Sequence, residues 1–243
     1  DQDTNQLQKL KLLSKLSESR GKEASGLMFK LPTDNEKVFH SDSQISRLIS
    51  QNEKEIKKIL KQAKFYIGHT RIVTHGSEKV DENLQPVKYN ETYLVHNGIC
   101  VNYKQIWKNL NLDGDVNLDS RSIAAFIDLN FGSNVFQMLS DEASGEVSII
   151  GYSKNKNKLF AYTNTGSIYF SIVNNKIKFL ASENYTLNQV SNEGTIEKLD
   201  PNNALIFTPQ GLIEDKLIIK NKKNIKHQFS VPRHNSEIND LNY

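Results

Sequence analysis

The stretch GHTRIVTHG, residues 68–76, places two histidines, two threonines and an arginine directly after the apolar and aromatic residues of a predicted strand. A second predicted strand, ETYLVHNGICV (residues 91–101), repeats this design, because an apolar run leads into His96, Asn97 and Gly98. So many hydrogen-bonding groups on two strands predict one shared site.

The pattern around these strands predicts an α+β chain. Leucines spaced as on one face of a helix predict an amphipathic helix over residues 5–19, and a second apolar stripe predicts a helix over 43–63. Three shorter helices are predicted, near residues 103–110, from about residue 120 and near 135–139. From Gly145 onward, short β-branched and aromatic runs between turn residues predict an antiparallel meander. This order favours one domain in which two antiparallel sheets pack together with helices outside.

The composition narrows the class of protein. The 243-residue chain has a net charge of +3 and its lysines are scattered, which argues against a nucleic-acid partner. No apolar stretch approaches the ~20 residues of a membrane span, and the first residues do not resemble a signal peptide. The one cysteine, Cys100, excludes an intramolecular disulfide and a cysteine-rich metal site, and it favours a reducing, cytoplasmic location.

Arg71 is the strongest candidate ligand-binding residue of the first stretch. A guanidinium offers a planar fork that suits a carboxylate or a phosphate, and a structural ion pair is an equally good interpretation. His69 and His75 could each serve as an acid, a base or a metal ligand. Their spacing differs from that of a helical metal motif and no cysteine or aspartate cluster accompanies them, so we expect no metal.

Asn97 and Gly98 have two interpretations, an Asn-Gly hairpin turn or an oxyanion hole formed by the asparagine amide and the glycine N–H. Asp119 begins a predicted helix, where it could be an N-cap or could bind an ammonium group. An arginine for a carboxylate, an aspartate for an ammonium group and an oxyanion hole would together define an amino-acid amide substrate. Cys100 lies between Ile99 and Val101, and a buried small side chain is favoured over a nucleophile.

Several ordered motifs resemble the glutaminase domain of class II glutamine amidotransferases, which are N-terminal-nucleophile (Ntn) hydrolases. The motifs are GHTRIVTHG, NLQP, LVHNGICVNY, LDSRSIAAFI, GEVSIIGYS and FLASENYTL, and LLSKLSESRGKEASGLMF is similar to an early segment of the family. The resemblance runs from about Leu10 to Leu187, and more loosely to Leu217. Within the family it is nearest to glucosamine-6-phosphate synthase and more distant from asparagine synthetase B.

The resemblance implies a four-layer αββα sandwich that hydrolyses L-glutamine to glutamate and ammonia. The ammonia would pass to a synthetase domain or partner subunit, and no cofactor or metal is implied in this domain. The implied roles are the glutamine α-carboxylate for Arg71, the lining of the same pocket for Thr74 and His75, the α-ammonium for Asp119, and the oxyanion hole for Asn97 and Gly98. The loop over residues 76–89 would be a lid, and a homodimer is left open.

The sequence also departs from the family pattern. Ile72 replaces an aromatic residue, NLQPV replaces NAHPH, and Lys22 and Glu23 differ from the usual residues after the arginine and glycine of the early motif. The family nucleophile is an N-terminal cysteine whose own α-amine acts as the base, and neither it nor the first strand is found here.

We expect residues 1–219 to form the amidotransferase domain, with its first strand and nucleophile outside the given sequence, and residues 220–243 to form a polar tail or linker to a synthetase domain. The alternative is a catalytically dead pseudo-glutaminase that binds glutamine or acts as a regulatory module. The acceptor of the ammonia would be a sugar phosphate or an ATP-activated substrate.

Overall fold

A computed structural model of the chain describes residues 2–33, 35–71, 84–132 and 134–220. The elements of its first half are α1 (Gln2–Ser17), the 3-10 helix η1 (Glu18–Arg20), β1 (Ala24–Lys30), β2 (Glu36–Ser41), α2 (Ile45–Gln51), α3 (Glu53–Leu60), β3 (Phe65–Arg71), β4 (Val87–Tyr89), β5 (Thr92–Cys100) and α4 (Tyr103–Asn109). The second half contains α5 (Asp119–Asn130), α6 (Val135–Glu142), β6 (Gly145–Ser153), β7 (Lys158–Thr163), β8 (Ile168–Val173), β9 (Lys176–Ala181), α7 (Asn184–Val190), β10 (Thr195–Leu199), β11 (Asn203–Phe207) and β12 (Ile213–Ile218).

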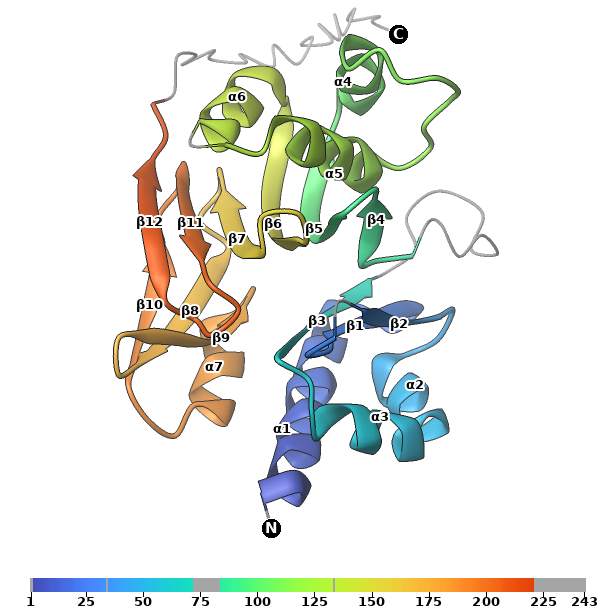
Figure 1. The fold of residues 1–243 in the computed structure, drawn as a ribbon, viewed down its shortest axis with the longest axis vertical. Coiled ribbons are helices and arrows are strands. Elements are labelled where there is room, and N and C mark those ends of the chain that lie inside the picture. Colours follow the sequence, from blue (N-terminus) through green and yellow to red (C-terminus); the bar gives the residue numbers. More distant parts are fainter. Residues whose placement is uncertain (1, 34, 72–83, 133, 221–243) are drawn as a thin grey trace, which may run out of the picture.

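The elements stack as helices, sheet, sheet and helices, which confirms the predicted α+β class (Figure 1). One layer is a six-stranded antiparallel sheet in the order β12-β11-β7-β6-β5-β4, and helices α4, α5 and α6 cover its outer face. The other layer consists of two three-stranded sheets, β2-β1-β3 and β10-β8-β9. Helices α1, α2, α3 and α7 lie beyond these sheets.

Three apolar clusters fill the spaces between the layers. The first, which contains Ile127 and Phe136, packs α4–α6 on the six-stranded sheet, and the second, which contains Met28 and Phe170, lies between the sheets. The third packs α1–α3 on β1 and β2 and includes Leu10. Each cluster forms because one stripe of a helix or one face of a strand is apolar, as the sequence periodicity predicts.

One helix prediction was wrong, and one helix was not predicted. The stripe over residues 43–63 predicts one helix, but the chain forms α2 and α3, which meet at Asn52. The Asn52 side chain donates to the Leu48 carbonyl at 2.9 Å, and the backbone leaves the helical region there at φ −112°. Helix α7 was not predicted, because its short sequence NYTLNQV lies among β-rich segments and has little helical periodicity of its own.

Within the described part of the chain, no helix is long and apolar enough to cross a membrane.

Candidate functional site

A cavity of about 1100 Å³ interrupts the layer formed by the two three-stranded sheets. All of β3 and residues 177–181 of β9 line it, α1 covers it through Leu10 and Leu13, and the six-stranded sheet contributes Val95 and Phe207. Among the described strands, β3 pairs only with β1 and β9 only with β8. The cavity is therefore bounded by two strand edges and has apolar walls above and below.

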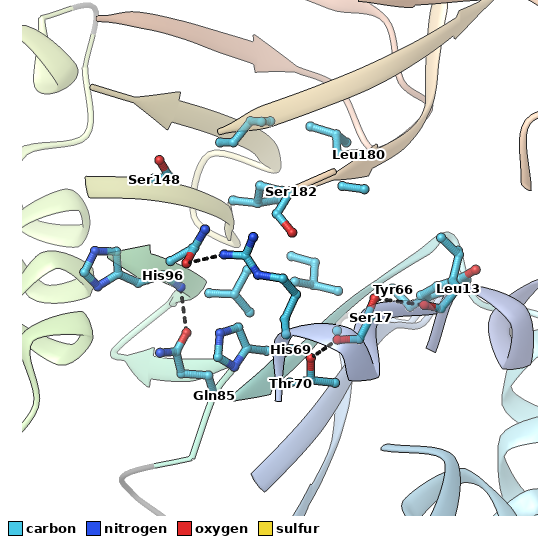
Figure 2. Close-up of a pocket in the computed structure, with 18 of the residues that line it drawn as sticks. Leu13, Ser17, Tyr66, His69, Thr70, Gln85, His96, Ser148, Leu180 and Ser182 are labelled. Atoms are coloured by element: carbon cyan, nitrogen blue, oxygen red, sulfur yellow. Dashed lines mark hydrogen bonds between the residues drawn. The ribbon is translucent and has the colours of Figure 1, made fainter. Parts of the chain in front are cut away.

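One end of this cavity is polar and contains most of the described candidate residues. The cavity is lined by four predicted site residues, Arg71, Asn97, Gly98 and Asp119. It is also lined by His69, which the sequence suggested as an acid, a base or a metal ligand, and by three residues to which the sequence gave no role, Arg20, Gln85 and Glu183. Figure 2 shows His69, Gln85 and His96 gathered at this end, with Ser148 and Ser182 on the other side. Segments far apart in the sequence therefore meet at one site, as the two polar strand segments predict.

Arg20 orients the side chain of Asn97. Its Nη2 donates to Asn97 Oδ1 at 3.1 Å, and its Nη1 lies 3.4 Å from Glu183 Oε1. Because a guanidinium can only donate, the asparagine oxygen faces Arg20 and the asparagine amide nitrogen remains to donate elsewhere. Both Arg20 and Glu183 lie in motifs that carry the family resemblance, which is the signal that could have identified them.

Asn97 and Gly98 lie inside β5 and do not form a hairpin turn, so the turn interpretation was wrong. They pair with Ser148 and Val147 of β6. Gly98 has φ +136°, and a Cβ at this position would collide with the carbonyl oxygen of Glu146. Only glycine fits here without displacing the Glu146 backbone.

Asp119 is the first residue of α5, and Leu118 occupies the N-cap position, so the N-cap interpretation was wrong. Its Oδ1 accepts from the Ser120 N–H at 2.7 Å, while Oδ2 accepts from the Cys100 N–H at 2.9 Å and lies 3.4 Å from His96 Nδ1. Burial alone would raise the pKa of the Asp119 carboxyl, but the hydrogen bond and charge of His96 and the two amide hydrogen bonds outweigh burial and hold the pKa below its usual value. Asp119 is therefore a carboxylate at neutral pH.

His69 and Arg71 are two residues apart in β3, so their side chains lie on the same face of the strand, and both residues line the cavity. Burial, followed by the charges of Arg71 and His96, lowers the pKa of His69 to about 3. The imidazole is thus neutral near pH 7 and is unsuited to proton transfer there. Its Nδ1 is buried without a partner among the described residues.

Thr74 and His75 lie outside the described residues, as does most of the predicted lid over residues 76–89. The end of that segment is described, and it does not behave as a surface loop. Leu84 and Gln85 are buried, and Val87–Tyr89 form β4.

Cys100 is fully buried in the cluster under α4–α6, which confirms the interpretation as a buried side chain. Burial, followed by the charge of Asp119, raises the pKa of its thiol to about 11, so it is a poor source of thiolate. In the described ranges no three His, Cys, Asp or Glu side chains are grouped so that they could hold a metal ion.

No protein-family model matches the chain, but comparison with known proteins finds relatives in sequence. The chain is similar to the isomerizing glutamine–fructose-6-phosphate aminotransferase of Buchnera aphidicola, with 25% identity over 229 residues that cover 85% of this chain and 36% of that protein. It is also similar to the 7-cyano-7-deazaguanine synthase of Saccharolobus solfataricus, with 22% identity over 227 residues that cover 90% of this chain and 48% of that protein. The chain spans less than half the length of both relatives.

Two solved structures share the fold. The glutamine phosphoribosylpyrophosphate amidotransferase of B. subtilis matches with a TM-score of 0.63 and 17% identity, over 90% of this chain and 46% of that chain. A structure described as the allosteric regulatory enzyme of purine biosynthesis matches with a TM-score of 0.64 and 20% identity, over 86% of this chain and 46% of that chain. These matches agree with the resemblance that the motifs predict: the chain is similar in sequence to part of a glutamine–fructose-6-phosphate aminotransferase, and it shares the fold of these amidotransferase structures.

Proposed function

We propose that this domain hydrolyses L-glutamine to glutamate and ammonia. The observation that carries the proposal is the pair of donors at Asn97 and Gly98, which lies in one cavity with the Arg71 guanidinium and the Asp119 carboxylate. Arg71 would bind the substrate α-carboxylate and Asp119 the α-ammonium, and Thr74 and His75 would complete this pocket. The Asn97 amide and the Gly98 N–H would stabilise the oxyanion that forms when the glutamine amide is attacked.

The attacking group would be a cysteine thiolate on a β-strand seated between β3 and β9. Two observations support such a strand. Among the described strands β3 has no partner besides β1, and β9 has none besides β8, although the start of β9 is bonded on the cavity side by the Gly211 carbonyl, which accepts from the Ile177 N–H at 2.8 Å. The cavity of about 1100 Å³ lies between these two strands. The cysteine α-amine would take the thiol proton, the thiolate would attack the amide carbon, and the resulting α-ammonium would give its proton to the amide nitrogen, which leaves as ammonia. Water would then cleave the thioester and release glutamate.

The ammonia would pass to a synthetase domain or to a partner subunit. Support comes from the curated relatives, in which the matched region is less than half of the protein. The acceptor would be a sugar phosphate, as the name of the Buchnera relative suggests, or an ATP-activated compound.

The test uses the natural full-length protein. N-terminal sequencing and intact-mass measurement identify the mature first residue, and glutamate release from L-glutamine is then measured. A mature N-terminal cysteine with glutaminase activity is the expected result. Glutamine binding without any hydrolysis would contradict the proposal and favour the pseudo-glutaminase, because the buried Cys100 thiol could not substitute as the nucleophile.

A further inference from the structure

The edge of β5 that faces away from β6 is only partly covered by another strand. Strand β4 pairs with Thr92, Tyr93 and Leu94 and then ends, so beyond Leu94 no described strand lies on this side. In an antiparallel strand every second residue directs its N–H to the same edge. The amides of His96, Gly98 and Cys100 therefore share this open edge.

Two of these three amides are capped by side chains. The His96 N–H donates to Gln85 Oε1 at 2.6 Å, and the Cys100 N–H donates to Asp119 Oδ2 at 2.9 Å. The Gly98 N–H lies between them. Strand β6 does not use it, because Val147, the residue opposite Gly98, exchanges its backbone hydrogen bonds with Asn164 on the other side at 2.8 and 3.0 Å.

The two capping side chains are joined to each other. Gln85 Nε2 donates to Ser120 Oγ at 3.1 Å, and Ser120 in turn donates to Asp119 Oδ1 through its backbone N–H at 2.7 Å. Gln85 is only 6% exposed, and Figure 2 shows its side chain reaching the His96 backbone beside the cavity. A continuous chain of hydrogen bonds thus spans Gly98 from one side to the other.

The backbone of Gln85 is fixed from the opposite layer. Its carbonyl oxygen lies so close to Gly26 of β1 that a Cβ on Gly26 would collide with it. The carbonyl of the next residue, Pro86, is 3.1 Å from His40 Nε2 on β2. The position of Gln85, and with it the cap on His96, is therefore set by β1 and β2 and not by β5 alone.

We propose that Gln85 is a positioning residue for the Gly98 N–H. By capping His96 while Asp119 caps Cys100, it fixes the β5 backbone on both sides of Gly98 and leaves that one amide available to the oxyanion. The expected effect of Gln85 on catalysis rests on the proposed glutaminase function. Its effect on the backbone of β5, which is the geometric part of the inference, can be measured without an activity assay.

The test compares variants of the natural full-length protein. Gln85→Met keeps the length of the side chain but removes both hydrogen bonds. Gln85→Glu keeps the acceptor for the His96 N–H, and in its protonated form, which burial favours, its hydroxyl can donate to Ser120 Oγ as the Gln85 amide does. Gln137→Met is the control, because Gln137 bonds the backbone of Lys220 on the exposed surface.

For Gln85→Met we expect kcat for glutamine hydrolysis to fall about 10- to 100-fold with KM within about twofold, since a misplaced oxyanion donor acts on the transition state. Hydrogen exchange of the β5 amides should become at least about tenfold faster, because the His96 amide loses its acceptor. Gln85→Glu should retain most of both properties, and Gln137→Met should match the wild type.

Unchanged kcat in an active Gln85→Met protein would overturn the inference, and so would an equal loss in Gln85→Glu or unchanged exchange of β5. Absence of glutaminase activity in the wild-type protein would instead contradict the proposed function, and the exchange measurement would then decide the geometric part by itself.

Discussion

At the residue scale, the orientation of the two oxyanion donors depends on side chains that do not themselves contact a substrate in the proposed mechanism. Arg20 determines which end of the Asn97 amide is free, because it can only donate to the oxygen. Glycine at position 98 is required by its positive φ and by the close carbonyl of Glu146. Neither constraint is visible in a local pattern, since the partners are separated by 77 residues for Arg20 and Asn97.

Substituting Arg71 by Ala should raise the KM for glutamine roughly 10- to 100-fold, because hydrogen bonds to a charged group contribute about 1.5–3 kcal/mol. Steady-state kinetics of glutamate release measure this. Arg47→Ala, on the exposed face of α2, serves as the control and should leave KM unchanged. An active Arg71→Ala protein with the wild-type KM would exclude Arg71 from substrate binding.

His69 should make the stability depend on pH. Its pKa is about 3 in the folded protein against an ordinary value of 6.5, so the unfolded chain binds the proton more readily between these values. Stability due to the neutral imidazole is complete above pH 6.5 and is lost as the pH falls toward 3, with a slope of at most about 1.4 kcal/mol per pH unit. Urea unfolding at several pH values should show a flatter profile for His69→Asn, and identical profiles would refute the assignment.

At the element scale, the ends of β1 and β2 are joined by a buried ion pair at the end of the sheet remote from Arg71. Lys30 Nζ lies 2.6 Å from Glu36 Oε1, and the two side chains are 4% and 5% exposed. Lys154, which follows β6, lies 3.4 Å from the other oxygen of Glu36. The charged group thereby links β1 and β2 to the six-stranded sheet.

Lys30→Met should lower the free energy of unfolding by about 3 kcal/mol, because removing one partner leaves a buried charge with less compensation. The double variant Lys30→Met, Glu36→Leu should lose less than that, since it removes both charges. Denaturant titrations compare the two proteins. A double variant as unstable as the sum of both single variants would show that the pair is not energetically coupled.

Sequence periodicity was sufficient to predict helices and strands whose apolar residues recur regularly. It was insufficient where a contact of one side chain determines where an element ends. The leucine stripe predicted the helix that became α1, and apolar runs that lead into polar residues predicted β3 and β5. The break at Asn52 follows from one side-chain hydrogen bond, which no periodicity encodes. For the site, the motif order named Arg71, Asn97, Gly98 and Asp119, but the roles of Arg20 and Gln85 emerge only when distant segments are brought together.

At the scale of the whole molecule, the layer that faces the six-stranded sheet is divided by the cavity between β3 and β9. The proposed strand would pair with both edges and join the two halves. In the natural full-length protein, backbone amides of β3 and β9 on the cavity side should then exchange with solvent about as slowly as those of β6 and β7 in the centre of the other sheet. Hydrogen exchange measures this directly, and fast exchange along both edges would argue against a seated strand.

The salt bridge between Arg20 and Glu183 crosses that same division, because Arg20 follows α1 on one side and Glu183 precedes α7 on the other. A relative shift of the two halves would therefore pull on the guanidinium that holds the Asn97 oxygen. Separation of the two halves and loss of the proposed oxyanion hole would therefore occur together. We expect a molecule whose halves have moved apart to have no glutaminase activity, rather than a reduced rate.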